Sequence, residues 1–251
     1  MDVYDRMAHR VRGRGRTLMY IALAGLALVI GLAGYTWWSN RQANAARLAL
    51  GKAIEVAEAP VVTGTPIAGE TGPTFPSERE RAQKAVEEFQ KVQSGYGAPY
   101  SELARYFAAV NLVTVDRNKG LGELEAIAKG GNSEVAGRAK FALAQAREAD
   151  AQYDAAASIY QELLKSKDGT ISENTLNLRL AAVYEKQNKK DEAADILFRM
   201  VEAARKEVGK DGKPAQPSAT IRAASERLQT LSPARYAQLP AEPPPASSIP
   251  F

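Results

Sequence analysis

Hydrophobic and polar residues follow two different patterns along the chain. Residues 18–38 (LMYIALAGLALVIGLAGYTWW) form an apolar run without a charge. From residue 40 onward, apolar residues recur every three or four positions between polar ones, which places them on one face of an α-helix. No window combines β-branched alternation with hairpin turn residues, so no sheet is expected. The pattern predicts an all-α protein in which an N-terminal transmembrane helix precedes a solenoid of helical hairpins.

The apolar run has the dimensions of a membrane span. A helix of this length extends about 31 Å, which matches the hydrocarbon core of a bilayer. Tyr35, Trp37 and Trp38 lie at its C-terminal end, and such side chains prefer the headgroup layer. Residues 1–17 hold five arginines, more positive charge than follows the run, and the more basic flank stays in the cytoplasm. We expect a single-pass protein of the bacterial inner membrane with a cytoplasmic N-terminus and a periplasmic or extracytoplasmic repeat domain.

A cleaved signal peptide is the alternative interpretation of this run. Ala43-Asn44-Ala45 offers small residues at the spacing of a cleavage site. The run is longer than the ~7–15 residues of a signal-peptide core, and the triplet lies well beyond Trp38. These features favour an anchor that is retained.

Two segments lead from the run to the repeats. Residues 40–59 predict an amphipathic helix that continues from the apolar run and whose small apolar face needs a partner. Residues 60–76 hold four prolines and three glycines and predict a flexible connector. Ser77 and Glu80 then form a capping box at the start of a helix that ends within residues 95–99. Later turns are expected at residues 116–120, 130–133, 150–152, 168–172 and 187–190.

A repeated order of large and small residues is the strongest signal. A large residue precedes a small one and then an aromatic on the first helix, and a small residue precedes a large apolar one on the second. Two copies lie 37 residues apart, and a weaker copy lies 36 residues before the first of the two. Their positions are Leu143, Ala144, Tyr153, Ala156, Tyr160 and Leu163; Leu180, Ala181, Tyr184, Ala193, Leu197 and Met200; Phe107, Ala108, Gly120, Leu124 and Ile127; and, as half a copy, Ala85, Phe89 and Val92.

This order is typical of tetratricopeptide repeats. Small residues let paired helices approach closely, and large ones fill the groove between pairs. The sequence departs from the pattern in its missing leading Trp, at Arg147 in place of the first-helix aromatic, and at Asp168 and Arg205, where a repeat usually has proline. An ordinary helical bundle is the alternative, because Leu-Ala pairs are common in alanine-rich helices. Copies in register favour a tetratricopeptide-like helical-hairpin solenoid.

The basic leader, the span ending in aromatics and the repeats together resemble the YfgM-like family, the ancillary subunits of the SecYEG translocon. The segment from Gly95 to Ala104 (GYGAPYSELA) is similar to the family's Tyr-Gly…Leu-Ala joint between the first half repeat and the next. The resemblance covers roughly residues 1–205, and the proline-rich insert and long tail depart from it. It implies association with translocon subunits, periplasmic chaperones or newly exported chains.

The chain thus divides into six predicted parts. The last helix is expected to begin at Ser218 and to cover the final repeat with Ile221, Ala224, Leu228 and Leu231. The parts are a basic cytoplasmic leader (1–17), the transmembrane helix (18–38), an amphipathic helix and linker (39–76), the repeat domain (77–209), a loop and capping helix (210–239) and a proline-rich disordered tail (240–251).

Composition argues against catalysis. The chain has no cysteine, and its one histidine, His9, lies in the leader, which excludes thiol, zinc and histidine-based chemistry from the repeats. No phosphate-binding glycine loop follows a strand. Most of the net charge of +4 comes from the leader, so no basic face for nucleic acid is expected. The sequence predicts no enzyme, no cofactor, no metal, no nucleic acid and no small-molecule substrate.

The first helices of such a stack line a concave groove, whose outward residues are the candidate protein-binding site. Arginines there could anchor a peptide, and asparagines could bond an extended backbone. A solvated helix face is the alternative, because charged residues occupy such faces by default. The candidates are Glu102, Arg105, Asn111, Arg138, Gln145, Thr175, Asn177 and Glu185.

Anchor, orientation and repeats together predict a membrane-tethered protein-binding scaffold. The resemblance places it with the Sec translocon and periplasmic chaperones in protein export. The alternative function is a tetratricopeptide coordinator of envelope or outer-membrane assembly, whose groove binds a lipoprotein or a cell-wall enzyme.

Overall fold

A computed structural model describes residues 15–62, 72–130, 133–166, 169–208 and 215–242, except for the side chains of residues 15–18, 21 and 22. Within these ranges the chain is helical, with an isolated bridge between Val61 and Phe75, a further bridge residue at Val208 and no sheet, so the predicted all-α fold is confirmed. The helices are α2 (Gly15–Glu58), α3 (Glu78–Gly95), α4 (Tyr100–Val115), α5 (Arg117–Ala128), α6 (Ser133–Ala149), α7 (Tyr153–Ser166), α8 (Glu173–Lys186), α9 (Lys190–Lys206), α10 (Ala219–Leu231) and α11 (Pro233–Tyr236).

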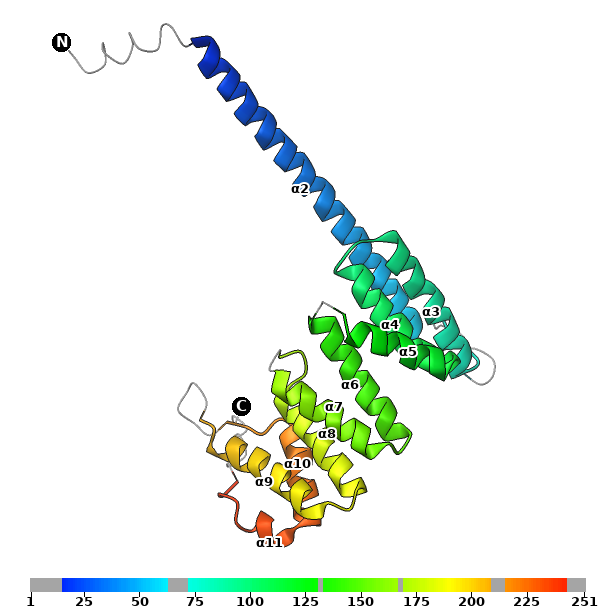
Figure 1. Cartoon of the computed structure of the whole chain (residues 1–251), viewed down its shortest axis with the longest axis vertical. Helices are drawn as coiled ribbons and strands as arrows, with labels where there is room; N and C mark the ends of the chain where they lie inside the picture. The colour runs from blue at the N-terminus through cyan, green and yellow to red at the C-terminus, as the bar shows by residue number, and fades with distance from the viewer. Residues whose placement is uncertain (1–14, 63–71, 131–132, 167–168, 209–214, 243–251) are drawn as a thin grey trace, which may run out of the picture.

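The helices form a stack of hairpins from which one long helix projects. The N-terminal part of α2 extends alone away from the other helices, and its C-terminal part lies beside α3 and α4 (Figure 1). From α3 onward each helix packs against the next along the chain, and α10 packs on both α8 and α9. The predicted helical-hairpin packing is therefore present.

The C-terminal part of α2 is the first helix of this stack. Ala46, Leu50 and Ala53 are buried, and Leu50 and Ala53 share a core cluster with Phe89 of α3 and Ala104 of α4. The half copy found in the sequence is thus completed by α2, whose apolar face meets α3. One uninterrupted helix joins the projecting apolar segment to the core, with no flexible joint between them.

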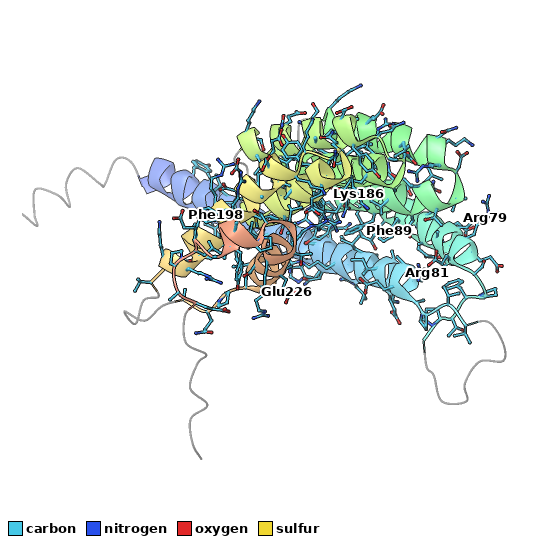
Figure 2. The ribbon with its side chains drawn as sticks, turned by 90° about the horizontal axis from the view of Figure 1, so that it is seen from below. Arg79, Arg81, Phe89, Lys186, Phe198 and Glu226 are labelled. Atoms are coloured by element: carbon cyan, nitrogen blue, oxygen red, sulfur yellow. The ribbon has the colours of Figure 1, made fainter. Side chains whose placement is uncertain are left out.

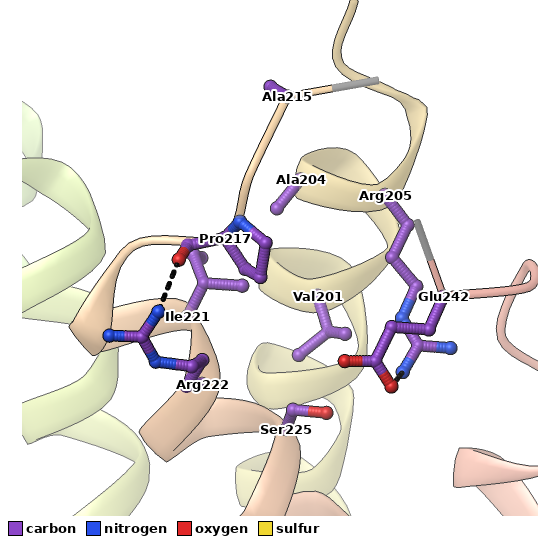
Figure 3. Close-up of a pocket in the computed structure, with 9 residues that line it drawn as sticks. All are labelled: Val201, Ala204, Arg205, Ala215, Pro217, Ile221, Arg222, Ser225 and Glu242. Atoms are coloured by element: carbon purple, nitrogen blue, oxygen red, sulfur yellow. Dashed lines mark hydrogen bonds and ion pairs between the residues drawn. The ribbon is translucent and has the colours of Figure 1, made fainter. Parts of the chain in front are cut away.

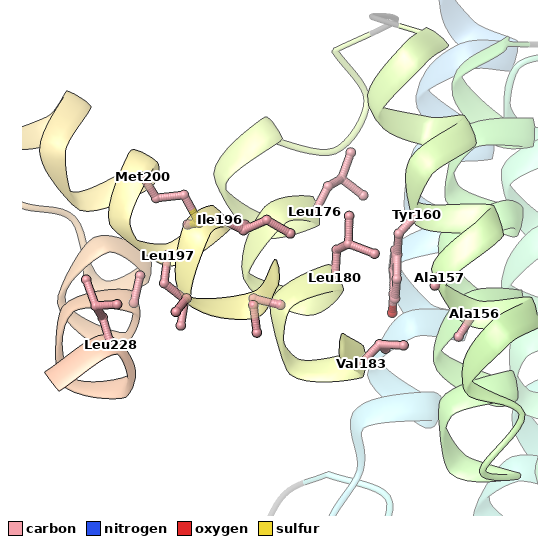
Figure 4. Close-up of a cluster of buried hydrophobic side chains, with 14 of the residues drawn as sticks. Ala156, Ala157, Tyr160, Leu176, Leu180, Val183, Ile196, Leu197, Met200 and Leu228 are labelled. Atoms are coloured by element: carbon pink, nitrogen blue, oxygen red, sulfur yellow. The ribbon is translucent and has the colours of Figure 1, made fainter. Parts of the chain in front are cut away.

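The repeat positions form the hydrophobic core. In the two full copies every position is buried apart from Tyr153 and Tyr184, which are half-buried. Tyr160 of α7 has no exposed surface and lies next to Leu180 and Val183 of α8 (Figure 4). The small residues Ala144, Ala156, Ala181 and Ala193 are fully buried, as close helix pairing requires.

The turn expected at residues 116–120 is wrong, because only Asp116 separates α4 from α5. Asp116 has an extended backbone, and its carboxylate accepts a hydrogen bond from the Lys119 N–H at 3.2 Å, which caps α5. That bond holds the pKa of Asp116 below its usual range. Gly120 lies inside α5, where a Cβ would come within 2.4 Å of the Val113 nitrogen. The glycine serves helix contact and not a turn.

Both serine caps predicted from the sequence are confirmed. The Ser77 hydroxyl accepts from the Glu80 N–H at 3.2 Å at the start of α3, and the Ser218 hydroxyl accepts from the Ile221 N–H at 3.3 Å at the start of α10. The short helix α11 was not expected. Arg205 ties this end of the chain to α9, because it donates to the Pro240 carbonyl at 2.6 Å and lies over the Tyr236 ring.

The two ends of the proline-rich connector are held together. The Val62 N–H donates to the Phe75 carbonyl at 2.9 Å, and the Phe75 N–H donates to the Pro60 carbonyl at 3.1 Å. Arg81 points toward the end of α2 and donates to the Ala59 carbonyl, whereas Arg79 points away into solvent (Figure 2). The connector therefore leaves and re-enters the stack beside the α2–α3 hairpin.

Several predicted segments fall beyond this description. Residues 1–14 of the leader, 63–71 of the connector and 243–251 of the tail lie outside the described residues. Among residues whose positions are described, no helix contains a stretch long and apolar enough to cross a membrane. In the apolar part of α2, the large side chains that are described are exposed, from 52% at Met19 to 66% at Tyr35.

Loss of the Tyr160 hydroxyl is expected to weaken the α6–α7 hairpin. The buried hydroxyl donates to the Glu148 carboxylate of α6, so Tyr160→Phe should cost about 1–2 kcal/mol by leaving that carboxylate short of a partner. Adding Glu148→Gln should recover part of the loss. The free energy of unfolding from urea titrations of the wild type and the two variants measures this. A free energy of unfolding that is unchanged in Tyr160→Phe would show that the bond contributes nothing.

The same bond has a pH signature. Burial raises the pKa of Tyr160, so the folded protein keeps the hydroxyl protonated where an unfolded tyrosine already loses its proton. The stability it contributes is complete below about pH 10 and falls as pH rises above that value. The stability difference between the wild type and Tyr160→Phe should therefore shrink above about pH 10.

Candidate protein-binding surface

The charged residues predicted to line the groove are paired within the fold. Arg105 of α4 binds Glu123 of α5 at 3.0 Å, and Glu185 of α8 binds Arg227 of α10. Arg138 binds Glu134, one turn earlier on α6, at 2.8 Å. These pairs join neighbouring helices or successive turns, which is what charges on a solvated helix face do.

Two of the remaining candidates are hydrogen-bonded within their own helix or its cap. Asn111 donates its side-chain N–H to the Phe107 carbonyl of its own helix at 2.9 Å, and the Thr175 hydroxyl lies 2.8 Å from that of Ser172 in the α8 cap. Glu102 and Gln145 are half-buried on α4 and α6. Asn177 differs from the others, because it borders two surface hollows.

The hollows form a continuous groove along α8 and α9. One, of about 370 Å³, lies over Leu180 and Tyr184 of α8; the next, of about 300 Å³, shares Asn177, Ile196 and Arg199 with it. A third, of about 520 Å³, shares Asn174, Met200 and Ala203 with the second and ends at the segment before α10. We call this surface the α8–α9 groove. Its lining includes the apolar and amide residues Leu164, Asn174, Asn177, Leu180, Tyr184, Ile196, Met200, Ala203 and Pro217, and the charged residues Glu173, Glu192, Asp195, Arg199, Lys206 and Glu207.

The size of Asn177 explains why the groove is open. Asn177 lies one turn before Leu180 and two turns before Tyr184 on the same face of α8. A tetratricopeptide first helix has a large leading residue, and the sequence lacks it. With a short amide in this place, a hollow remains above Ile196 and Met200 of α9, which are themselves buried in the core.

The polar atoms at the rim are available to a ligand. Among the described residues, the side chains of Asn174 and Asn177 make no hydrogen bond, and Arg199 bonds only the Asp195 carbonyl of its own helix at 3.3 Å. Two amides and a guanidinium above an apolar floor suit an extended polypeptide, whose backbone offers donors and acceptors at regular intervals. Sequence reasoning named Asn177 but missed its neighbours on α9, because they belong to a second helix.

The cavity between α9, α10 and the C-terminal segment is a different kind of space. Figure 3 shows it lined by Val201 and Ile221, with Arg205 and Glu242 on one side and Arg222 donating to the Pro217 carbonyl on the other. Its volume of about 20 Å³ has room for about one water molecule. It is a packing gap and not a ligand site.

Neither a cluster of metal-binding side chains nor a similarity to known proteins identifies the function of the groove. Across the described ranges, no three His, Cys, Asp or Glu side chains come together as metal ligands would. No family model, curated protein or solved structure matches the chain. The features that bear on function are therefore the fold and two surfaces that it exposes, the α8–α9 groove and the apolar part of α2.

Proposed function

We propose that this protein is a membrane-tethered, tetratricopeptide-like scaffold that binds other proteins through the α8–α9 groove. The observation that carries the proposal is the groove itself, an apolar floor with unbonded amides at its rim, on a stack of hairpins. Such stacks present extended surfaces on which partner segments lie.

The apolar part of α2 supports the tether. Large apolar side chains exposed on one isolated helix are unfavourable in water and require a partner or a lipid environment. They are Met19, Leu23, Leu26, Leu28, Val29, Ile30 and Leu32, followed by Tyr35, Trp37 and Trp38. The arginines of the leader orient such a segment with its N-terminus in the cytoplasm. We therefore propose an inner-membrane location with the hairpin stack outside the cytosol.

The resemblance to the YfgM-like family supports the choice of partners. We propose translocon subunits, periplasmic chaperones or newly exported chains as the proteins that the groove binds. The groove suits a chain that has just been exported, because an unfolded segment is extended and offers apolar side chains together with free backbone groups.

Site-specific photo-cross-linking in cells tests this function. A photo-cross-linking amino acid at Ala203, exposed on the groove, should yield adducts with translocon subunits, periplasmic chaperones or exported chains. The same amino acid at Gln90, exposed on α3, is the matched control and should yield few. Equal adducts from both positions, or none from Ala203, would contradict the proposed site. Capture of a lipoprotein or a cell-wall enzyme would support envelope assembly instead.

A further inference from the structure

The segment of α2 that follows the aromatic residues has an unusual charge pattern. No acidic residue occurs between Asp5 and Glu55, so the basic residues of α2 have no acid on their own helix until its last turn. Of these, Arg47 is engaged, because its Nε donates to the Tyr100 hydroxyl of α4 at 2.6 Å. Among the residues that the structure describes, Arg41 contacts only an aromatic ring, with its guanidinium carbon 5.6 Å from the centre of the Trp37 ring.

Position along the helix separates Arg41 from the other cations. With Trp38 at the edge of the hydrocarbon, Arg41 lies about 4.5 Å further along the axis, Arg47 about 14 Å and Lys52 about 21 Å, at about 1.5 Å per residue. The headgroup layer on each side of a bilayer is about 5–8 Å deep. Only Arg41 falls within it. Because α2 continues without a break into the core, these positions are fixed relative to the hairpin stack.

We propose that Arg41, stacked on Trp37, binds the phosphate of anionic phospholipid headgroups at the membrane surface. The guanidinium pairs with phosphate through two parallel N–H donors, and the indole ring holds it in place from below. No acid on α2 competes for it, and the buried face of α2 that packs in the hairpin stack begins at Ala46, beyond Arg41. This inference rests on the proposed membrane tether and adds a lipid preference to it.

Fluorescence quenching by brominated lipids tests the proposal. Trp37 and Trp38 are the only tryptophans in the chain, so their emission reports lipid contact at this site alone. The full chain is reconstituted in vesicles with equal fractions of brominated phosphatidylglycerol or brominated phosphatidylcholine. Phosphatidylglycerol should associate about fivefold more strongly, the effect of one basic residue near an anionic surface. Arg41→Gln should reduce the ratio to about one.

Lys52→Gln is the matched control, because it removes one positive charge from the same helix well beyond the screening length of the headgroup charges. The fivefold ratio should survive in that variant. Equal quenching by both lipids in the wild type, or a ratio unchanged in Arg41→Gln, would overturn the lipid site while leaving the tether intact. No quenching by either lipid would show that the aromatic end of α2 does not reach a bilayer, which removes the tether and the lipid site together.

Discussion

Gly120→Ala is expected to destabilise the protein by about 3 kcal/mol, at the upper end of the cost of overpacking. A Cβ on Gly120 would lie 2.4 Å from the nitrogen and 2.7 Å from the Cα of Val113. These are backbone atoms of α4 and cannot rotate away as the end of a side chain would. The helices α4 and α5 must therefore move apart, which opens the packing around Leu124. Urea unfolding of the reconstituted full chain, followed by circular dichroism, measures the loss.

Gly122→Ala is the matched control for this prediction. Gly122 lies on the same helix two residues later, is exposed, and would place its Cβ in open space. Alanine is favoured over glycine inside an exposed helix by about 0.5–1 kcal/mol, so this variant should be slightly more stable than the wild type. The two substitutions are chemically identical and should act in opposite directions. If both had the same sign, the close α4–α5 contact would be wrong.

Phe89→Ala is expected to cost about 3–5 kcal/mol, because it removes a large side chain with no exposed surface from the first core cluster. The ring stacks on Phe107 with a centroid distance of 5.3 Å and packs with Leu50 and Ala53 of α2. Its loss leaves a cavity at the junction of α2, α3 and α4. The free energy of unfolding should fall, and Arg47 should lose its fixed contact with Tyr100.

Leu48→Ala is the comparison for that effect. Leu48 lies on the same stretch of α2 but is 64% exposed, so its truncation should change stability by no more than about 0.5 kcal/mol. A loss for Phe89→Ala as small as that for Leu48→Ala would mean that α2 does not belong to the hairpin stack.

The core of this protein was readable from the sequence because it depends on local spacing. Ala144, Tyr160, Leu180 and Leu197 each occupy a position of the repeated pattern, in which apolar residues follow the spacing of one helix face. All four are buried. The caps at Ser77 and Ser218 were equally predictable, since a capping hydrogen bond needs only residues three positions apart.

The wrong turn at residues 116–120 has its physical origin in residues that serve more than one element. Asp116 and Gly120 are turn formers by composition, yet one residue ends α4 and caps α5, and the other permits close contact inside a helix. The expected continuation of the apolar run into an amphipathic helix over residues 40–59 is present in α2, whose C-terminal part also supplies the first helix of the stack. The stripe of Ala46, Leu50 and Ala53 was the available signal, but its partner on α3 lies beyond the connector.

The α8–α9 groove could be predicted only in part. Asn177 stands out in the sequence as a polar residue on a first helix, but the hollow depends on what Ile196 and Met200 leave uncovered, which is a property of packing between two helices. Ion pairs between helices could not be predicted from the sequence either. Arg105 and Glu185 resemble ligand-binding charges until the fold brings Glu123 and Arg227 beside them.

Membrane topology is the most direct test of the proposed tethered scaffold. Because the chain contains no cysteine, Lys186→Cys on exposed α8 and Gly13→Cys in the leader each introduce a single thiol. In intact spheroplasts a membrane-impermeant maleimide should label the cysteine at position 186 and leave the one at position 13 unlabelled until lysis, with both proteins resisting alkaline extraction. Labelling of position 186 only after lysis, or release of the protein by alkaline extraction, would contradict the account.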